Sequence, residues 1–92
     1  MTDKFRMLIA NIYSLPNGPA VTGRIESGMV RLGDSLTLDG ACGKFPVKVI
    51  FIERFQEALT EANSASDLVG LTLSGIDFNQ IRNRDLLLDD VS

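Results

Sequence analysis

Apolar residues recur at every second position, or in short runs, along most of the chain, and Gly, Pro or polar residues separate these segments. A period of two is typical of strands, because successive side chains of a strand point to opposite faces. The segments with this pattern are 5–15, 20–26, 30–32, 35–38, 45–55, 68–74 and 86–88. The pattern predicts an all-β fold of six or seven short strands, arranged as a barrel or a sandwich.

Strict alternation assigns a face to each residue of the two longest segments. In 5–15 one face carries Phe5, Met7, Ile9, Asn11 and Tyr13, and the other carries Leu8, Ala10 and Ile12. In 45–55 one face carries Val47, Val49, Phe51 and Glu53, and the other carries Lys48, Ile50, Ile52 and Arg54. Because apolar residues occupy both faces of 5–15, we expect that strand to be buried on two sides for part of its length.

Turn signals separate the strands. The strongest is Pro16-Asn17-Gly18-Pro19, which is expected to close a hairpin, because its prolines lack backbone donors and Asn-Gly favours a turn. Gly28 and Gly33 are natural turn positions, since Gly adopts positive φ at no steric cost. A further turn is expected at 39–44, and Pro46 is expected at a strand start or a sheet edge.

Six short motifs follow one another along the chain. They are F-x-x-x-I-x-x-I-Y at 5–13, V-T-G-R-I at 21–25, S-G-x-V at 27–30, G-D-x-L at 33–36, V-x-x-I-x-x-F at 49–55 and V-G-L-T-L-S-G-I at 69–76. In this order and spacing they resemble the second domain of the translational GTPases, the β-barrel that follows the nucleotide-binding domain in elongation factor Tu. The resemblance implies a closed, six- to seven-stranded antiparallel barrel spanning residues 1–92 as one domain.

The resemblance also decides between two interpretations of the polar segment Gln56–Asp67. Periodicity alone predicts a short helix at Glu57–Ala62. The resemblance instead implies an irregular crossing with at most one helical turn, and we expect the crossing. A single helical turn is expected within Ile76–Asn83.

In elongation factor Tu this domain helps to hold the acceptor end of aminoacyl-tRNA, and relatives dock the same barrel on ribosomal RNA. The residues Tyr13, Thr22 and Glu53 match the pocket of that family in type. An aromatic ring can stack on a base, and a carboxylate and a hydroxyl can bond base or ribose edges. The resemblance thus makes these three residues candidates for RNA binding, with strand packing as the alternative for Tyr13 and Thr22.

Other positions depart from the family pattern. Asn11, a further candidate, stands with Ala10 where the family has an acidic pair, and the loop at 16–19 lacks the family's Arg. The departures further along the chain are Leu68 for Asn and Ser66 and Arg84 for Gly. Arg24 of V-T-G-R could bond a phosphate, although an ion pair or a strand-face contact is the favoured role.

Composition narrows the chemistry. The chain has 92 residues, a net charge of −3, no His and one Cys. Without His neither a Ser-His-Asp nor a Cys-His nucleophile can form, and one Cys allows no internal disulfide. No phosphate-loop motif, metal-ligand spacing, signal peptide or 18-residue apolar run occurs. We therefore expect a cytoplasmic chain that has no membrane segment, cofactor or metal and binds no nucleoside triphosphate.

A domain that binds nucleic acid mainly through charge should be basic. The net charge of this chain is −3, which disfavours tight nonspecific binding to DNA or RNA. Seven of the nine cations lie in the first 54 residues, so a local basic patch stays open. The expected function is a non-catalytic binding module that contacts tRNA, ribosomal RNA, the ribosome or a translation-related partner. The alternative is a protein–protein interaction module that has lost the RNA role. The chain begins with Met and ends soon after the last strand, which suits a free-standing protein and leaves an excised domain open.

Overall fold

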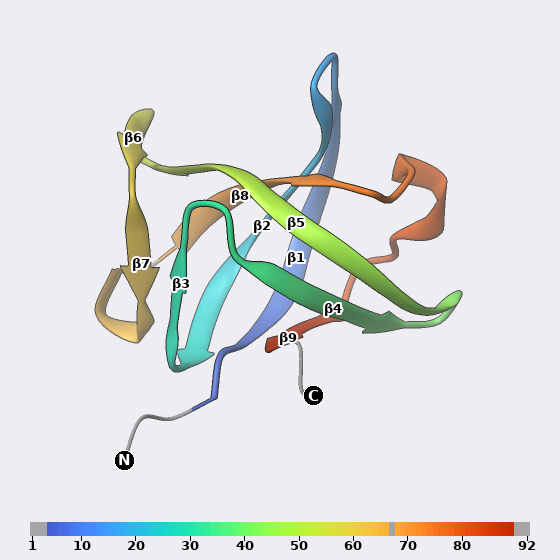
Figure 1. The fold of residues 1–92 in the computed structure, drawn as a ribbon, viewed down its shortest axis with the longest axis horizontal. Coiled ribbons are helices and arrows are strands. Elements are labelled where there is room, and N and C mark those ends of the chain that lie inside the picture. The colour runs from blue at the N-terminus through green and yellow to red at the C-terminus, as the bar shows by residue number, and fades with distance from the viewer. Residues whose placement is uncertain (1–3, 67, 90–92) are drawn as a thin grey trace.

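The computed structural model describes residues 4–66 and 68–89 (Figure 1). Its strands are β1 (Arg6–Leu15), β2 (Gly18–Ser27), β3 (Met29–Arg31), β4 (Ser35–Gly40), β5 (Gly43–Arg54), β6 (Glu57–Leu59), β7 (Glu61–Asn63), β8 (Leu68–Ser74) and β9 (Leu86–Asp89). Two single-turn 3-10 helices are η1 (Ser64–Ser66) and η2 (Phe78–Gln80). The helical turn expected within Ile76–Asn83 is confirmed.

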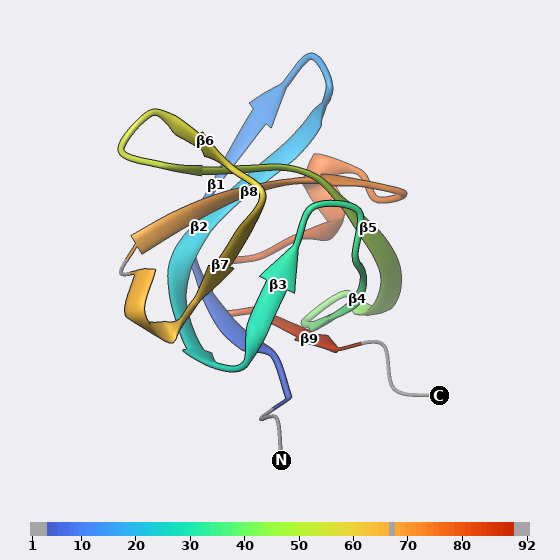
Figure 2. The ribbon, with the colours of Figure 1, turned by 60° about the vertical axis from the view of Figure 1, so that its left-hand side comes forward.

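Six strands close into a barrel in the order β4-β9-β1-β2-β8-β5, and the pairing of β4 with β5 completes the ring. All of these pairings are antiparallel, and β6 extends the sheet beyond β5. The short strands β3 and β7 form a separate two-stranded sheet, which stands in front of the barrel strands in Figure 2. The expected all-β, six- to seven-stranded antiparallel barrel is confirmed.

The barrel is filled by one hydrophobic core. Its fully buried large side chains are Phe5, Met7, Ile9, Val21, Val30, Leu36, Leu38, Val49, Ile52, Leu71, Leu73 and Leu87. Val30 of β3 and Ala62 of β7 belong to the same cluster, so the small sheet packs its inner face against the barrel core. Removal of this apolar surface from water is the main favourable term in folding.

Two β-bulges change the faces that strict alternation assigns. In β1, Ile9 pairs with Gly23 and Asn11 pairs with Thr22, so Ala10 is an extra residue. A bulge residue has no partner of its own, and the side chains beyond it therefore change face. Asn11 and Tyr13 lie on the outer face, and the prediction that they share a face with Phe5, Met7 and Ile9 is wrong.

The prediction that 5–15 is buried on two sides for part of its length is also wrong. Leu8 and Ala10 are exposed on the outer side of β1, because none of the described segments covers that side. In β5 the extra residue is Ile50, because Val49 pairs with Leu73 and Phe51 with Thr72. The expected common face of Val47, Val49, Phe51 and Glu53 is therefore wrong as well.

The segment Gln56–Asp67 is more regular than expected, although its last residue lies outside the described residues. Instead of an irregular crossing it contains β6, β7 and η1. The turn between β5 and β6 consists of Phe55 and Gln56, whose φ angles are 52° and 66°. Two successive positive φ angles match the right-handed twist of a hairpin, which lets a polar sequence continue the sheet.

A buried carboxylate joins two turns at one end of the barrel. Asp85 is 4% exposed, and its oxygens accept hydrogen bonds from the backbone N–H groups of Ala41 (3.2 Å) and Arg82 (2.8 Å). Ala41 lies in the β4–β5 turn and Arg82 precedes β9, so Asp85 links segments that are 44 residues apart. Gly40 leaves the space that the carboxylate occupies, because a Cβ at this position would overlap it.

Candidate functional site on the outer barrel face

Three predicted site residues form one row across the outer face of four neighbouring strands. Asn11 of β1 pairs with Thr22 of β2, Thr22 pairs with Gly70 of β8, and Gly70 pairs with Glu53 of β5. The bulges at Ala10 and Ile50 create this row, because they turn the side chains of Asn11 and Glu53 outward. We refer to the four positions together as the polar row.

Gly70 makes room for the Glu53 side chain. A Cβ at position 70 would lie 3.3 Å from Glu53 Cγ and 3.4 Å from Glu53 Oε1. It would also lie 3.7 Å from the methyl group of Thr22. The Glu53 side chain therefore lies over Gly70, close to the surface of the sheet.

The hydroxyl oxygen of Thr22 is buried and has no hydrogen-bond partner among residues 4–66 and 68–89. An unsatisfied buried polar atom costs about 1–3 kcal/mol, so it marks a point where a further polar contact would be favourable. Its cross-strand neighbour Asn11 is exposed and carries an amide that can donate or accept. The polar row therefore offers an amide, a hydroxyl and a carboxylate within the width of four strands.

A second row lies beside the polar row. Tyr13 pairs with Ala20, Ala20 with Thr72, and Thr72 with Phe51. Tyr13 is 50% exposed and Phe51 is 43% exposed, whereas Ala20 and Thr72 between them are buried. An aromatic ring therefore stands at each end of this row, and packing in the core does not account for Tyr13.

A hollow of about 270 Å³ extends from Phe51 toward the β1–β2 hairpin. It is lined by Leu15, Asn17, Ile50, Phe51, Glu53 and Thr72. We call it the Phe51 hollow. Its walls are mainly apolar, and Glu53 supplies a carboxylate at its border with the polar row.

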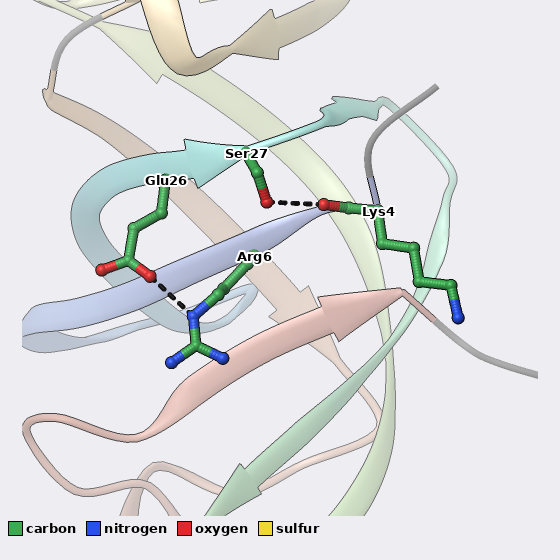
Figure 3. A network of polar contacts seen from close by, with 4 residues as sticks. All are labelled: Lys4, Arg6, Glu26 and Ser27. Atoms are coloured by element: carbon green, nitrogen blue, oxygen red, sulfur yellow. Dashed lines mark hydrogen bonds and ion pairs between the residues drawn. The ribbon is translucent and has the colours of Figure 1, made fainter. Parts of the chain in front are cut away.

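A second hollow of about 320 Å³ lies on the opposite side of the polar row. It is lined by Leu8, Ala10, Arg24, Glu26 and Leu68, and we call it the Leu8 hollow. Glu26 accepts a hydrogen bond of 2.7 Å from Arg6 Nε in an exposed ion pair, which Figure 3 shows beside the bond from Ser27 Oγ to the Lys4 carbonyl. An exposed ion pair contributes about 0–1 kcal/mol, so its main effect here is to position Glu26.

All five predicted site residues thus lie on one face: Asn11, Thr22 and Glu53 in the polar row, Tyr13 in the next row, and Arg24 on its other side. Alternation within single strands could not identify Gly70, Phe51 and Thr72, which complete the face, because their positions depend on pairing between strands.

In residues 4–66 and 68–89 no group of three or more His, Cys, Asp or Glu side chains is placed to hold a metal ion. Within the same ranges, no helix has the length and apolar character needed to cross a membrane.

The barrel topology defines the class of fold to which the chain belongs. The chain has the β-barrel fold that translation factors use as a domain, as the sequence resemblance implied. No protein-family model matches the sequence. Among solved structures, the chain is similar to translation elongation factor SelB from Methanococcus maripaludis in its apo form, with a TM-score of 0.84 and 30% sequence identity. The match covers 96% of this chain and 19% of the SelB chain, so this chain spans about a fifth of that protein's length.

Proposed function

We propose that the chain is a non-catalytic binding module that holds an unstacked nucleoside at the end of a translation-related RNA, such as the acceptor end of tRNA, in the cytoplasm. The observation that carries the proposal is the polar row, which brings Asn11, Thr22 and Glu53 together beside an aromatic-lined hollow. Single-stranded RNA is recognised in this manner, by aromatic stacking and by hydrogen bonds to base and ribose edges.

The size and lining of the Phe51 hollow support one nucleoside as the occupant. Its volume of about 270 Å³ lies just below the range of about 300–1,000 Å³ that is typical of sites for drug-sized ligands. Phe51 offers a ring face, and Glu53 can accept hydrogen bonds from ribose hydroxyls or exocyclic amines. The outer face carries the cation Arg24 and the acids Glu26 and Glu53. We therefore expect stacking and hydrogen bonds to contribute more to the affinity for RNA than phosphate contacts do.

One observation favours the protein–protein interaction module as a second candidate. Large hydrophobic side chains are exposed on this same face, and they are Leu8, Tyr13, Leu15, Ile50, Phe51 and Leu68. A contiguous exposed apolar area is a common mark of a protein-binding surface. The two functions use the same residues, so they are distinguished by whether binding of the partner requires RNA.

The direct test is fluorescence anisotropy with labelled, deacylated tRNA that has either an intact or a truncated 3′ end. Truncation of the 3′ end removes the terminal nucleoside that would stack on the protein, and it should weaken binding about 10-fold or more. The substitutions Tyr13→Ala and Glu53→Gln should each weaken binding of the intact tRNA by a similar factor. Leu32→Ala is the matched control, because Leu32 is an exposed hydrophobic residue that does not belong to the proposed binding face. Added salt should weaken binding through any phosphate contacts.

Equal affinity for intact and truncated tRNA would contradict the RNA proposal. An affinity pull-down from lysate with and without ribonuclease then tests the alternative. A partner that is retained after ribonuclease treatment and lost with Phe51→Ala would support protein binding through the outer face.

A further inference from the structure

In the described part of the chain, the outer half of β1 has an edge without a neighbouring strand. On the side away from β2, β9 pairs only with Arg6–Leu8. Ile9 continues this contact through backbone hydrogen bonds with Arg84 and Asp85. Beyond the bulge, β2 is the one strand of residues 4–66 and 68–89 that pairs with residues 11–15, and this part of the hairpin projects past the rest of the barrel in Figures 1 and 2.

The register shows which backbone groups are unpaired. Ser14 stands opposite Pro19, which has no N–H, so this pair cannot exchange two hydrogen bonds. Hydrogen-bonded and non-hydrogen-bonded pairs alternate in an antiparallel ladder. Ile12 and Ser14 therefore direct their N–H and C=O groups away from β2, and in the described part of the chain these groups have no partner.

This edge lacks two of the features that usually prevent strand addition, charged side chains and edge prolines, although the short helix η2 lies near β1. Natural edges are protected by charged side chains, prolines or a covering segment. The hairpin residues 11–20 include no charged side chain, and the two prolines lie at the tip and on β2. The side chains of Tyr13 and Leu15 beside the edge are both exposed.

A hollow of about 270 Å³ lies next to the hairpin, between residues 14–19 and the segment 76–78. Phe78 on its far wall is 45% exposed, and Asp77 is the one charged residue of its lining. Although the lining of the hollow is mainly polar, Phe78 offers an apolar contact to a side chain of a strand added to β1, and the Asp77 carboxylate favours a basic residue at one end of that strand. We call it the Phe78 hollow.

We propose that the free edge of β1 binds an extended peptide segment of a partner protein as an added β-strand. Ile12 and Ser14 supply two N–H and two C=O groups to its backbone, which gives affinity without sequence specificity. The Phe78 hollow supplies the specificity, for a segment of four or five uncharged residues with a Lys or Arg that reaches Asp77. This site uses the backbone edge of β1 and not the side chains of the polar row, although Leu15 and Asn17 line both the Phe78 hollow and the Phe51 hollow. The proposal does not depend on the proposed RNA function.

The test begins with selection of peptides from a random heptapeptide library displayed on phage, against the whole chain. We expect alternating apolar and uncharged polar peptides with a terminal basic residue, and their synthetic forms should bind in an anisotropy assay. Ser14→Pro should reduce this binding about 10-fold or more, because it removes an N–H that only the edge uses. Ser14→Ala keeps that N–H and should bind as the unsubstituted chain does.

A second measurement is independent of the folding of Ser14→Pro. Hydrogen exchange of the Ile12 and Ser14 amides in the unsubstituted chain should slow at least about 10-fold when the peptide is bound. Glu53→Gln should leave peptide binding unchanged, which separates this result from the RNA proposal. Failure to select any peptide, selected peptides that bind Ser14→Pro normally, or unchanged exchange at both amides would each overturn the proposal.

Discussion

Replacement of Asp85 by Ala tests how far one buried carboxylate holds the end of the barrel together. The substitution removes the acceptor of two backbone N–H groups, those of Ala41 at 3.2 Å and Arg82 at 2.8 Å. Hydrogen bonds to a charged acceptor contribute about 1.5–3 kcal/mol each. The Ala41 bond is long and both bonds are only partly buried, so water can replace part of them. We expect a loss of about 2–4 kcal/mol in the free energy of unfolding.

This loss is large for a small barrel, since total stability is about 5–15 kcal/mol. The assay is urea unfolding followed by circular dichroism, together with a thermal melt. In a domain of this size a loss of 1 kcal/mol lowers Tm by about 4–8 °C, so a decrease of about 10–25 °C is expected.

Asp39→Ala is the matched control, because Asp39 lies on β4 near the same turn and its carboxylate accepts no backbone N–H bond within residues 4–66 and 68–89. It should change the free energy of unfolding by less than about 0.5 kcal/mol. Asp85→Asn keeps one acceptor oxygen and should have an intermediate effect. Equal stability of Asp85→Ala and Asp39→Ala would refute the role assigned to Asp85.

Three further changes test the same physical reasoning at other positions. Gly40→Ala places a Cβ where the Asp85 carboxylate lies and should destabilise the chain by about 2–3 kcal/mol in urea unfolding, with a smaller effect in the Asp85→Ala background. Arg84→Gly should raise the free energy of unfolding by about 0.5–1 kcal/mol, because Arg84 has a φ of 73°; an unchanged or lower value would contradict the assigned strain. Gly70→Ala should displace the Glu53 side chain and weaken the proposed tRNA binding, while it lowers the free energy of unfolding by less than about 1.5 kcal/mol. Normal tRNA binding by this variant would show that the position of Glu53 does not matter for binding.

Local pattern was sufficient for the strand positions. The alternation at 20–26 and 35–38 and the glycines at 28 and 33, with φ angles of 73° and 90°, mark strands and turns that the structure contains. Pro46 lies in β5 at a point where only β4 is paired beside it, as the missing N–H predicts. Each of these features depends on a residue and its near neighbours in sequence.

The faces of the longest strands could not be obtained in this way. Ala10 and Ile50 are extra residues only with respect to the strands that pair with them, and nothing within β1 or β5 alone marks them. The same limit applies to 56–67, where β6 is a strand because β5 is beside it.

The amino-acid sequence by itself determined the all-β class and the positions of most strands along the chain, because these follow from a period of two and from the conformational preferences of Gly and Pro. It also determined the residue types available for binding. Only the tertiary structure decided that Asn11, Thr22, Gly70 and Glu53 form one row, and that the outer edge of β1 is unpaired within the described residues. The physical reason is that register and bulges arise from hydrogen bonding between strands distant in sequence, and a shift of one residue moves every following side chain to the other face.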